Sequence, residues 1–330
     1  MMVYKDSEFG EKMSEAATKH LDNELFERAE YSNDKAENQG FENYSYWKST
    51  FRAFSKNKVA MLMVFIIVIL LVFIAIEPFL PLHCDPNRIF YDAQGFEMLI
   101  NYKPYSEHIF GTNKIGQDLW SRMWSGTRTS LVIGIFVASI NEIIGIAVGA
   151  LWGYVKQLES IINEIYNTLN NIPSTIFLVL LTYVMRPSVT TLVVAMCMTV
   201  WMGTARFVRN QIIIIRDREY NLASRCLGTP TKRVILKNLL PYLVSVIVMR
   251  FALSIPSTIG SEVFMSYIGL GLPTNIPSLG NLVNEGRAII MSPSLRYQFF
   301  IPSILTSLLT IAFYVMGNAI ADASDPHNHV

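Results

Sequence analysis

The chain has 330 residues, of which 51% are hydrophobic and only 16% are charged. The formal net charge of +1 gives no global basic field, so nothing indicates nucleic acid as a partner. The apolar residues are concentrated in long blocks, which is typical of an all-α polytopic membrane protein. The three cysteines are an odd number without the spacing of metal ligands, so neither a disulfide framework nor a metal site is expected.

The first predicted element is a membrane span that follows a polar extension. Residues 1–46 have low hydrophobicity and mixed charge, from which we expect a solvated cytoplasmic segment. An uninterrupted apolar run at 59–76 is long enough to cross roughly 30 Å of hydrocarbon as a helix. Several Lys and Arg side chains precede it without a carboxylate, so the positive-inside rule predicts a cytoplasmic N-terminus. We group 47–82 as an interfacial lead-in with this span, and 83–128 as an external loop.

The remaining spans belong to a predicted core domain at 129–321. We expect five of them, at about 130–154, 172–185, 189–208, 242–267 and 299–320. With the first span they make six, which places the C-terminal tail, 322–330, in the cytoplasm as well. The connection at 268–298 is then external. The connection at 211–241 is cytoplasmic, and its many Arg and Lys side chains agree with that side of the membrane.

An amphipathic helix is predicted between the second and third spans. Its apolar residues recur at helical spacing: Leu158, Ile161, Ile162, Ile165 and Leu169. We expect this helix to lie in the plane of the inner membrane interface and to end near Pro173.

Common catalytic motifs are absent from the sequence. There is no Gly-rich phosphate loop followed by Lys-Ser or Lys-Thr, so the chain is not itself a P-loop ATPase. It also contains no His-Glu-x-x-His motif and no Gly-x-Ser-x-Gly nucleophile elbow. We therefore expect a non-catalytic protein with no cofactor of its own.

Small and polar residues inside the spans mark candidate functional positions. Gly145, Gly149 and Gly153 form a ladder at four-residue spacing, whose flat surface predicts a close contact with a helix of this chain or of a partner. Polar or ionisable groups at membrane depth are costly and usually face a cavity or a partner. They are Asn141, Glu142, Arg250, Ser257 and Glu262. We expect them to line a translocation pathway, with a structural network around Arg250 as the alternative.

The cytoplasmic stretch "EYNLASRCLGTPTKRVILKNLLP", at 219–241, predicts a helix, a sharp turn and a second helix. Gly228 suits the left-handed position that ends the first helix. Thr229 can cap the second helix, and Pro230 fits its first turn. We expect the second helix to end at Pro241. Together the two helices would form a knob that docks in another protein, and the alternative is a basic loop that anchors to anionic headgroups.

This stretch resembles the cytoplasmic EAA motif of the membrane subunits of ABC importers. The matching residues are Glu219, Ala223, Gly228 and Leu239-Leu240-Pro241, with Ser224 where a second Ala is usual. The resemblance implies the transmembrane fold of type I ABC importers, with a helix-turn-helix that inserts into an ATPase subunit. The residues to which it assigns this coupling role are Glu219, Ala223, Ser224, Arg225, Gly228, Thr229, Pro230 and Pro241.

Three further stretches resemble the C-type permeases of the di- and oligopeptide family, especially those of Gram-positive bacteria. They are "FGTNKIGQDLWSRMWSGTRTSL" at 110–131, "SYIGLGLPTNIPSLGNLVNEGR" at 266–287 and the ending "AIADASDP" at 319–326. Asn113 and Gln117 depart from the Asp and Arg that are commoner in the first of these stretches.

The resemblance implies a subunit of an ATP-driven peptide importer in a bacterial cell membrane. The implied partners are a homologous B-type permease, two ABC ATPases that bind ATP and magnesium, and an external peptide-binding protein. The substrate could instead be nickel or another receptor-delivered solute. Two competing functions are an ion-coupled secondary transporter that uses Glu142 or Glu262, and a membrane scaffold without transport.

Overall fold

The computed structural model describes residues 46–81, 83–92 and 94–324, and within them the long regular elements are all helices. The extended pairings in this part of the chain are three isolated bridges in the external loop. The chain divides into two units, Met1–Ser49 and Thr50–Val330, and the architecture below is that of the second unit. Nearly all of the predicted N-terminal extension, and residues 325–330 of the predicted tail, lie outside the described residues.

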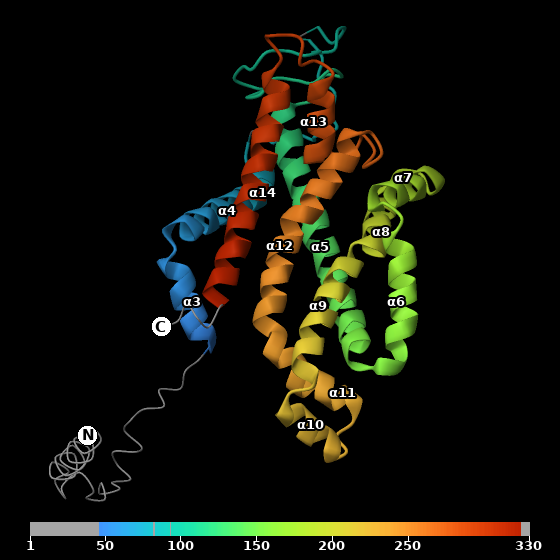
Figure 1. Ribbon diagram of the computed structural model, residues 1–330. Helices are drawn as coiled ribbons and strands as arrows, with labels where there is room; N and C mark the ends of the chain where they lie inside the picture. Colours follow the sequence, from blue (N-terminus) through green and yellow to red (C-terminus); the bar gives the residue numbers. More distant parts are fainter. Residues whose placement is uncertain (1–45, 82, 93, 325–330) are drawn as a thin grey trace, which may run out of the picture. The chain divides into compact units, whose positions relative to one another are not determined.

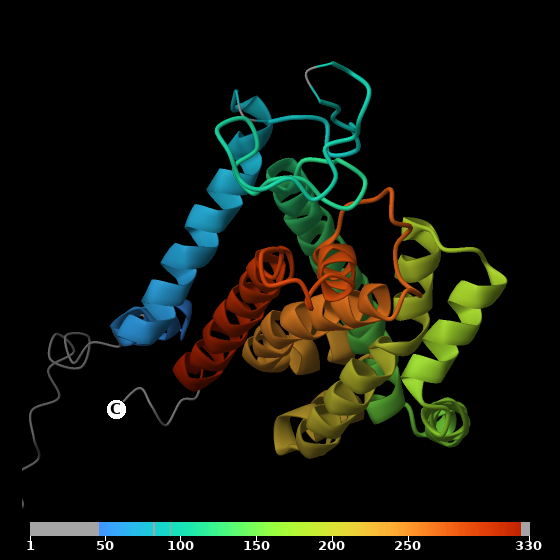
Figure 2. The same cartoon turned by 90° about the horizontal axis from the view of Figure 1, so that it is seen from above.

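The helices are joined by short turns or continue directly into one another, apart from the long external loop at 80–118 and two shorter loops at 268–278 and 288–296 (Figure 1). They are α3 (Tyr46–Lys56), α4 (Lys58–Ile76), the 3₁₀ turn Glu77–Phe79, α5 (Leu119–Tyr154), α6 (Lys156–Asn170), α7 (Ser174–Val184), α8 (Val189–Thr199), α9 (Trp201–Arg216), α10 (Glu219–Cys226), α11 (Thr231–Val234), the π-helical segment Ile235–Leu239, α12 (Leu240–Tyr267), α13 (Leu279–Arg287) and α14 (Tyr297–Ser324). Viewed from above, α5 and α12 lie centrally, with α14 on one side and α8 and α9 on the other (Figure 2).

Five helical stretches of the described residues are long and apolar enough to cross a membrane. They are Lys58–Phe79, Leu119–Tyr154, Val189–Arg216, Thr231–Tyr267 and Tyr297–Ser324. The segment predicted as the third span differs, because its helix α7 has only 11 residues. At about 1.5 Å per residue it is roughly 16 Å long, about half the thickness of the hydrocarbon layer. The six-span topology therefore stays a prediction.

The amphipathic helix α6 runs along α9 instead of lying across the ends of the spans. Arg209 Nη2 donates to Glu159 Oε1 at 2.5 Å, and Arg206 Nη1 donates to the Tyr166 hydroxyl at 3.1 Å. The contacts move forward along α6, from Glu159 to Tyr166, as they move back along α9, from Arg209 to Arg206. The two helices are therefore antiparallel neighbours. The predicted position in the plane of the interface is wrong, because these polar contacts hold α6 alongside α9, in the direction of the long spans (Figure 1). Its predicted end before Pro173 is confirmed.

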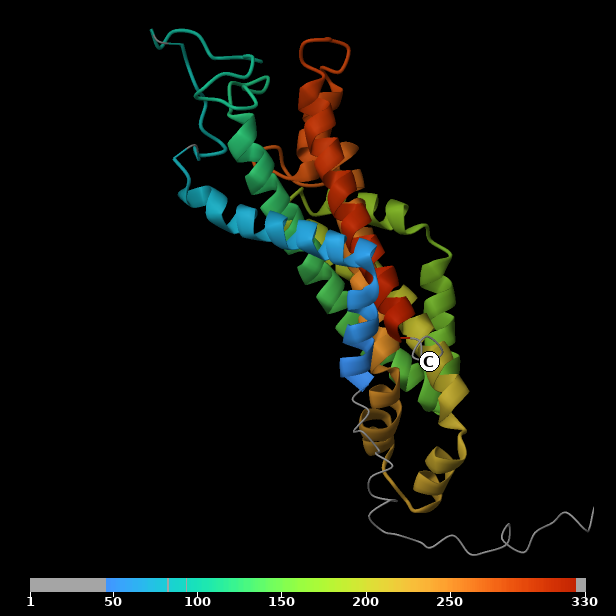
Figure 3. The ribbon, with the colours of Figure 1, turned by 90° about the vertical axis from the view of Figure 1, so that its left-hand side faces the viewer.

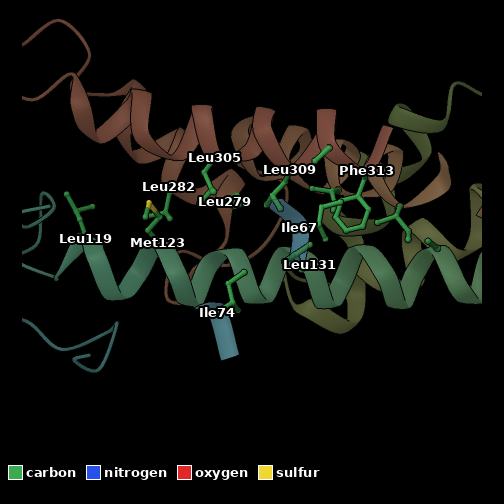
Figure 4. Close-up of a cluster of buried hydrophobic side chains, with 14 residues drawn as sticks. Ile67, Ile74, Leu119, Met123, Leu131, Leu279, Leu282, Leu305, Leu309 and Phe313 are labelled. Atoms are coloured by element: carbon green, nitrogen blue, oxygen red, sulfur yellow. The ribbon is translucent and has the colours of Figure 1, made fainter. Parts of the chain in front are cut away.

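The main apolar core lies where α4, α5, α12, α13 and α14 meet. Figure 4 shows side chains of α5 facing those of α14 across this core: Leu119, Met123 and Leu131 on α5, and Leu305, Leu309 and Phe313 on α14. Helix α4 adds Ile67 and Ile74 to the core and crosses α14 obliquely (Figure 3). Its remaining side chains are mostly exposed, as expected for a helix whose other faces meet lipid.

The glycine ladder of α5 faces α9 of the same chain. A Cβ at Gly145 would meet the Thr204 side chain, and a Cβ at Gly149 would collide with the Ala205 carbonyl oxygen. At Gly153 it would lie 2.9 Å from the Arg209 carbonyl oxygen. The absence of side chains at these positions lets the two backbones approach closely, so α5 and α9 form one tightly packed pair.

Candidate functional site

The candidate coupling segment, residues 219–241, lies at the end of α9 and α12 that is opposite the external loop (Figures 1 and 3). Arg216, the last residue of α9, donates from Nη1 to the Gly153 carbonyl oxygen at 2.8 Å. Asn221 is fully buried, and its Nδ2 donates to the Ile215 carbonyl oxygen at 2.8 Å. These bonds satisfy carbonyl groups near two helix ends: the first joins α9 to α5, and the second joins α10 to α9.

The turn after α10 has the predicted left-handed glycine. Gly228 has φ of 73°. Its N–H donates to the Arg225 carbonyl oxygen at 3.0 Å, and the Thr229 N–H donates to the Ser224 carbonyl oxygen at 3.1 Å. This pair of bonds is the Schellman motif that ends many helices. No atom lies within 4 Å of the position that a Cβ at Gly228 would take, so backbone conformation, not space, requires the glycine.

The second arm of the segment differs from the prediction in two ways. Thr229 does not cap it, since Pro230 occupies the N-cap position and no side chain bonds there. The arm also does not end at Pro241, which lies in the first turn of α12. The π-helical segment before it widens the helix, with the Leu240 N–H donating to the Ile235 carbonyl oxygen. Proline has no backbone N–H to donate, and the wider π-helical turn accommodates it. The arm therefore continues into α12.

A polar brace that the sequence did not reveal joins the two arms. Asn238 Nδ2 lies 3.4 Å from Asn221 Oδ1 and 3.3 Å from Ser224 Oγ, and it donates to both. Ser224 stands where a second alanine is usual in the motif, and its hydroxyl gives the brace an acceptor. The partners are separated by more than a helix in sequence, so spacing alone does not link them.

An apolar core holds the base of the segment against the spans. Its buried members are Ala150, Val208, Ile212, Ile215, Val234, Ile235, Leu239 and Leu243. Burial of each large aliphatic side chain contributes on the order of 2 kcal/mol. The base of the segment is therefore firmly joined to α5, α9 and α12.

The tip of the segment carries exposed apolar side chains. Leu227 is 86% exposed, and Tyr220 and Leu222 are each more than 40% exposed. Glu219 and Arg225 are exposed beside them. Exposed leucine among charged residues on a rigid projection is typical of a protein docking surface.

A polar groove of about 390 Å³ separates the segment from the junction of α5 and α6. Its lining consists of Tyr154, Val155, Lys156, Gln157, Arg225, Thr229 and Thr231. The Arg225 guanidinium lies 6.0 Å from the centre of the Tyr154 ring and 3.9 Å from Asp217. Arg225 and Thr229 thus line this groove.

The candidate pathway residues fall into two groups. Asn141, Glu142 and Glu262 are buried inside this chain, whereas Arg250 is half-buried and Ser257 is exposed on α12. Within this chain the first three side chains have almost no exposed surface, and the pathway role of all five residues stays a prediction.

Glu262 belongs to a hydroxyl network that joins three helices. Ser130 of α5 donates to its Oε2 at 2.7 Å, and Ser266 donates to its Oε1 at 3.0 Å. Ser130 Oγ also accepts the N–H of Leu279 at 3.1 Å, at the start of α13. The network satisfies a buried polar group and fixes α13 to α5 and α12.

The external ends of the same helices are joined by a buried ion pair. Arg122 is fully buried, and its Nη2 donates to Glu285 Oε1 at 2.9 Å and to the Thr274 carbonyl oxygen at 3.2 Å. Asp118 caps α5 by accepting the Ser121 N–H at 2.8 Å. The two stretches at 110–131 and 266–287, which the sequence singles out separately, therefore pack against each other.

Two family models match the sequence of this chain. The family model described as the inner membrane component of binding-protein-dependent transport systems matches residues 145–329. A second model, the N-terminal transmembrane domain of oligopeptide transport permease C, matches residues 45–104.

Several curated proteins are similar over most of the chain. The oligopeptide transport system permease protein AmiD of Streptococcus pneumoniae is 38% identical over 94% of this chain and 99% of its own length. The dipeptide permease DppC of Bacillus subtilis is 36% identical, over 86% of each chain. The oligopeptide permease OppC of Bacillus subtilis is 32% identical, over 92% of this chain and 96% of its own length. A chain of the MetNI methionine ABC transporter aligns at a TM-score of 0.49 and 20% identity, over 61% of this chain and 96% of that chain.

Proposed function

Because this chain belongs to the family of inner membrane components of binding-protein-dependent transport systems, we propose that it is a permease subunit of an ATP-driven oligopeptide importer. The substrate class is supported by relatives that are oligopeptide and dipeptide permeases. The chain is a multi-pass membrane protein. We place it in the cell membrane of a Gram-positive bacterium, in line with the organisms of those relatives.

The observation that carries the proposal is the continuity of the coupling segment with α12. The exposed tip at Leu227 is a docking surface for an ATPase subunit, as the EAA-like stretch implies. The second arm runs through the π-helical segment into α12 without a break. A displacement of the tip is therefore passed through the turn at Gly228 to the second arm, which continues as the central span α12.

The proposed partners are the other subunits that an ATP-driven importer requires. This chain would form half of the pathway and a homologous permease the other half. Two ABC ATPases would bind ATP and magnesium and perform the hydrolysis, so this subunit is non-catalytic. An external peptide-binding protein would deliver substrate to the outer face, and the bilayer would cover the exposed apolar sides of α4 and α7.

Reconstitution of the full complex with its receptor in vesicles tests the proposal. We expect labelled peptides to cross the membrane only when ATP is supplied on the side that carries the coupling segment, and uptake to persist with an uncoupler present. Uptake of nickel in place of peptide would contradict the proposed substrate. Uptake that collapses with the uncoupler while ATP is maintained would contradict ATP coupling and favour an ion-coupled transporter.

A further inference from the structure

Glu142 and Arg250 are opposite charges at similar depth in the predicted bilayer. Glu142 lies about 18 Å from the Tyr154 end of α5, and Arg250 lies about 15 Å from the start of α12, at about 1.5 Å per residue. Both distances are measured from the end that carries the coupling segment. A hydrocarbon layer about 30 Å thick places both charges near its middle.

Glu142 is only partly satisfied at this depth. The side chain is 4% exposed, and its Oε2 accepts a hydrogen bond from Thr204 Oγ1 at 3.1 Å. Its Oε1 is buried and has no partner in the described part of the chain. A carboxylate oxygen left unpaired at this depth is costly.

Arg250 lies against the same turn of α9 and is also incompletely paired. Its guanidinium carbon is 5.7 Å from the centre of the Phe207 ring, and its Nη2 lies beside Gly203. Its Nε is buried without a hydrogen-bond partner, and the ion pairs of the described residues include neither Arg250 nor Glu142. Gly203 and Thr204 are consecutive, so both charges contact adjacent residues of α9.

The two charges are attached to different helices, α5 and α12. Glu142 belongs to α5, which the glycine ladder locks to α9. Arg250 belongs to α12, which is continuous with the coupling segment. A shift of α12 along α9 would change the distance between Arg250 and the turn of α9 that contacts Glu142.

We propose that Glu142 and Arg250 form an ion pair in one state of the transport cycle and are separated, as here, in the other. The proposal rests on the proposed ATP-driven import, because it uses the motion of the coupling segment. Pairing would satisfy Glu142 Oε1 and one guanidinium N–H together, and so would stabilise the state in which α12 has moved. The distance between these two charges, near the middle of the membrane, would then depend on the nucleotide state of the ATPase subunits.

Cross-linking in the assembled importer tests the proposed change in distance. Cys84, Cys197 and Cys226 are replaced by serine, and Glu142→Cys is combined with Arg250→Cys, which removes both charges at once. With a short thiol cross-linker, we expect rates that differ about tenfold between the nucleotide-free and the vanadate-trapped states, as for a shifted two-state equilibrium. The control pair is Glu142→Cys with Thr204→Cys, whose rates should be equal because these side chains are already in contact. Equal rates for the 142–250 pair in both states would overturn the proposal.

Uptake by charge-neutral variants tests whether the two residues act together. We expect Glu142→Gln and Arg250→Gln each to lower uptake about tenfold, and the double variant to recover most of it, as coupled residues do. Ser254→Ala is the control, since within the described part of the chain its hydroxyl donates to the Phe251 carbonyl oxygen of its own helix. A double variant whose loss equals the product of the single losses would overturn the proposal, and Arg250 would then act on the substrate or on the partner permease. If the unmodified importer takes up no peptide, the proposed function fails, while the cross-linking rates, which need only ATP, still decide the question of the pair.

Discussion

Gly228 is the single residue on which the turn of the coupling segment depends. Its left-handed backbone costs a residue with a Cβ about 1–2 kcal/mol. We expect Gly228→Ala to lower uptake by the reconstituted importer several-fold, because the two arms lose their relative direction. Gly228→Asn is the matched control, since asparagine tolerates this conformation better and should retain more uptake. Equal uptake by both variants and the unmodified chain would show that the turn does not matter.

A substitution at Leu227 tests whether the tip of the coupling segment is the docking surface for the ATPase. The side chain is 86% exposed, so a substitution has little effect on the fold of this chain. We expect Leu227→Asp to reduce the amount of ATPase that co-purifies by about tenfold, because a docked leucine contributes on the order of 1.5 kcal/mol. Ile115→Asp, at an exposed position on the external loop, should leave co-purification unchanged. Retention of the ATPase by Leu227→Asp would remove Leu227 from the interface.

At the residue scale, the left-handed glycine could be predicted, the cap at Thr229 was predicted wrongly, and long-range pairing could not be predicted. The left-handed glycine follows from the properties of one residue and its neighbours. Two hydrogen bonds join residues that are far apart in sequence. One links Asn238 to Ser224, and the other links Ser130 to Glu262. A polar side chain in an apolar span indicates that a partner exists, but not which side chain it is.

At the scale of the helix, the close contact between α5 and α9 should be sensitive to added volume. A Cβ at Gly149 would collide with a backbone carbonyl oxygen, which cannot move unless α9 moves. We expect Gly149→Ala to lower the stability of the purified complex by about 1–3 kcal/mol, as overpacking does. Gly260→Ala is the control, because no atom lies within 4 Å of the added Cβ. Thermal unfolding of the two variants measures the difference.

The long spans could be predicted from hydropathy because their length and composition suffice to identify them. The position of α6 could not, since it depends on contacts from Arg206 and Arg209 to side chains of another helix. The continuation of the second arm through Pro241 could not either, because the π-helical segment that accommodates the proline leaves no clear sequence signal.

On the scale of the whole subunit, the ion pair of Arg122 and Glu285 joins the external ends of α5 and α13. Arg122 is fully buried, so removal of its carboxylate partner leaves an uncompensated charge. We expect Glu285→Ala to destabilise the complex by on the order of 3 kcal/mol, seen as a lower Tm. Glu97→Ala, at an exposed position in the external loop, should leave Tm unchanged. An unchanged Tm for Glu285→Ala would mean that the other bonds of Arg122 suffice.

The central claim is that the segment from Glu219 to Pro241 couples ATP hydrolysis to movement of the spans. The most direct measurement is peptide uptake per ATP hydrolysed by the reconstituted importer, compared between the unmodified chain and Glu219→Arg. Glu219 is exposed at the start of α10, where the positive end of the helix dipole stabilises its carboxylate. The account predicts that Glu219→Arg lowers peptide uptake per ATP hydrolysed about tenfold, a change of about 1.4 kcal/mol in coupling. Uptake per ATP hydrolysed at the unmodified value, with the ATPases still bound, would contradict it.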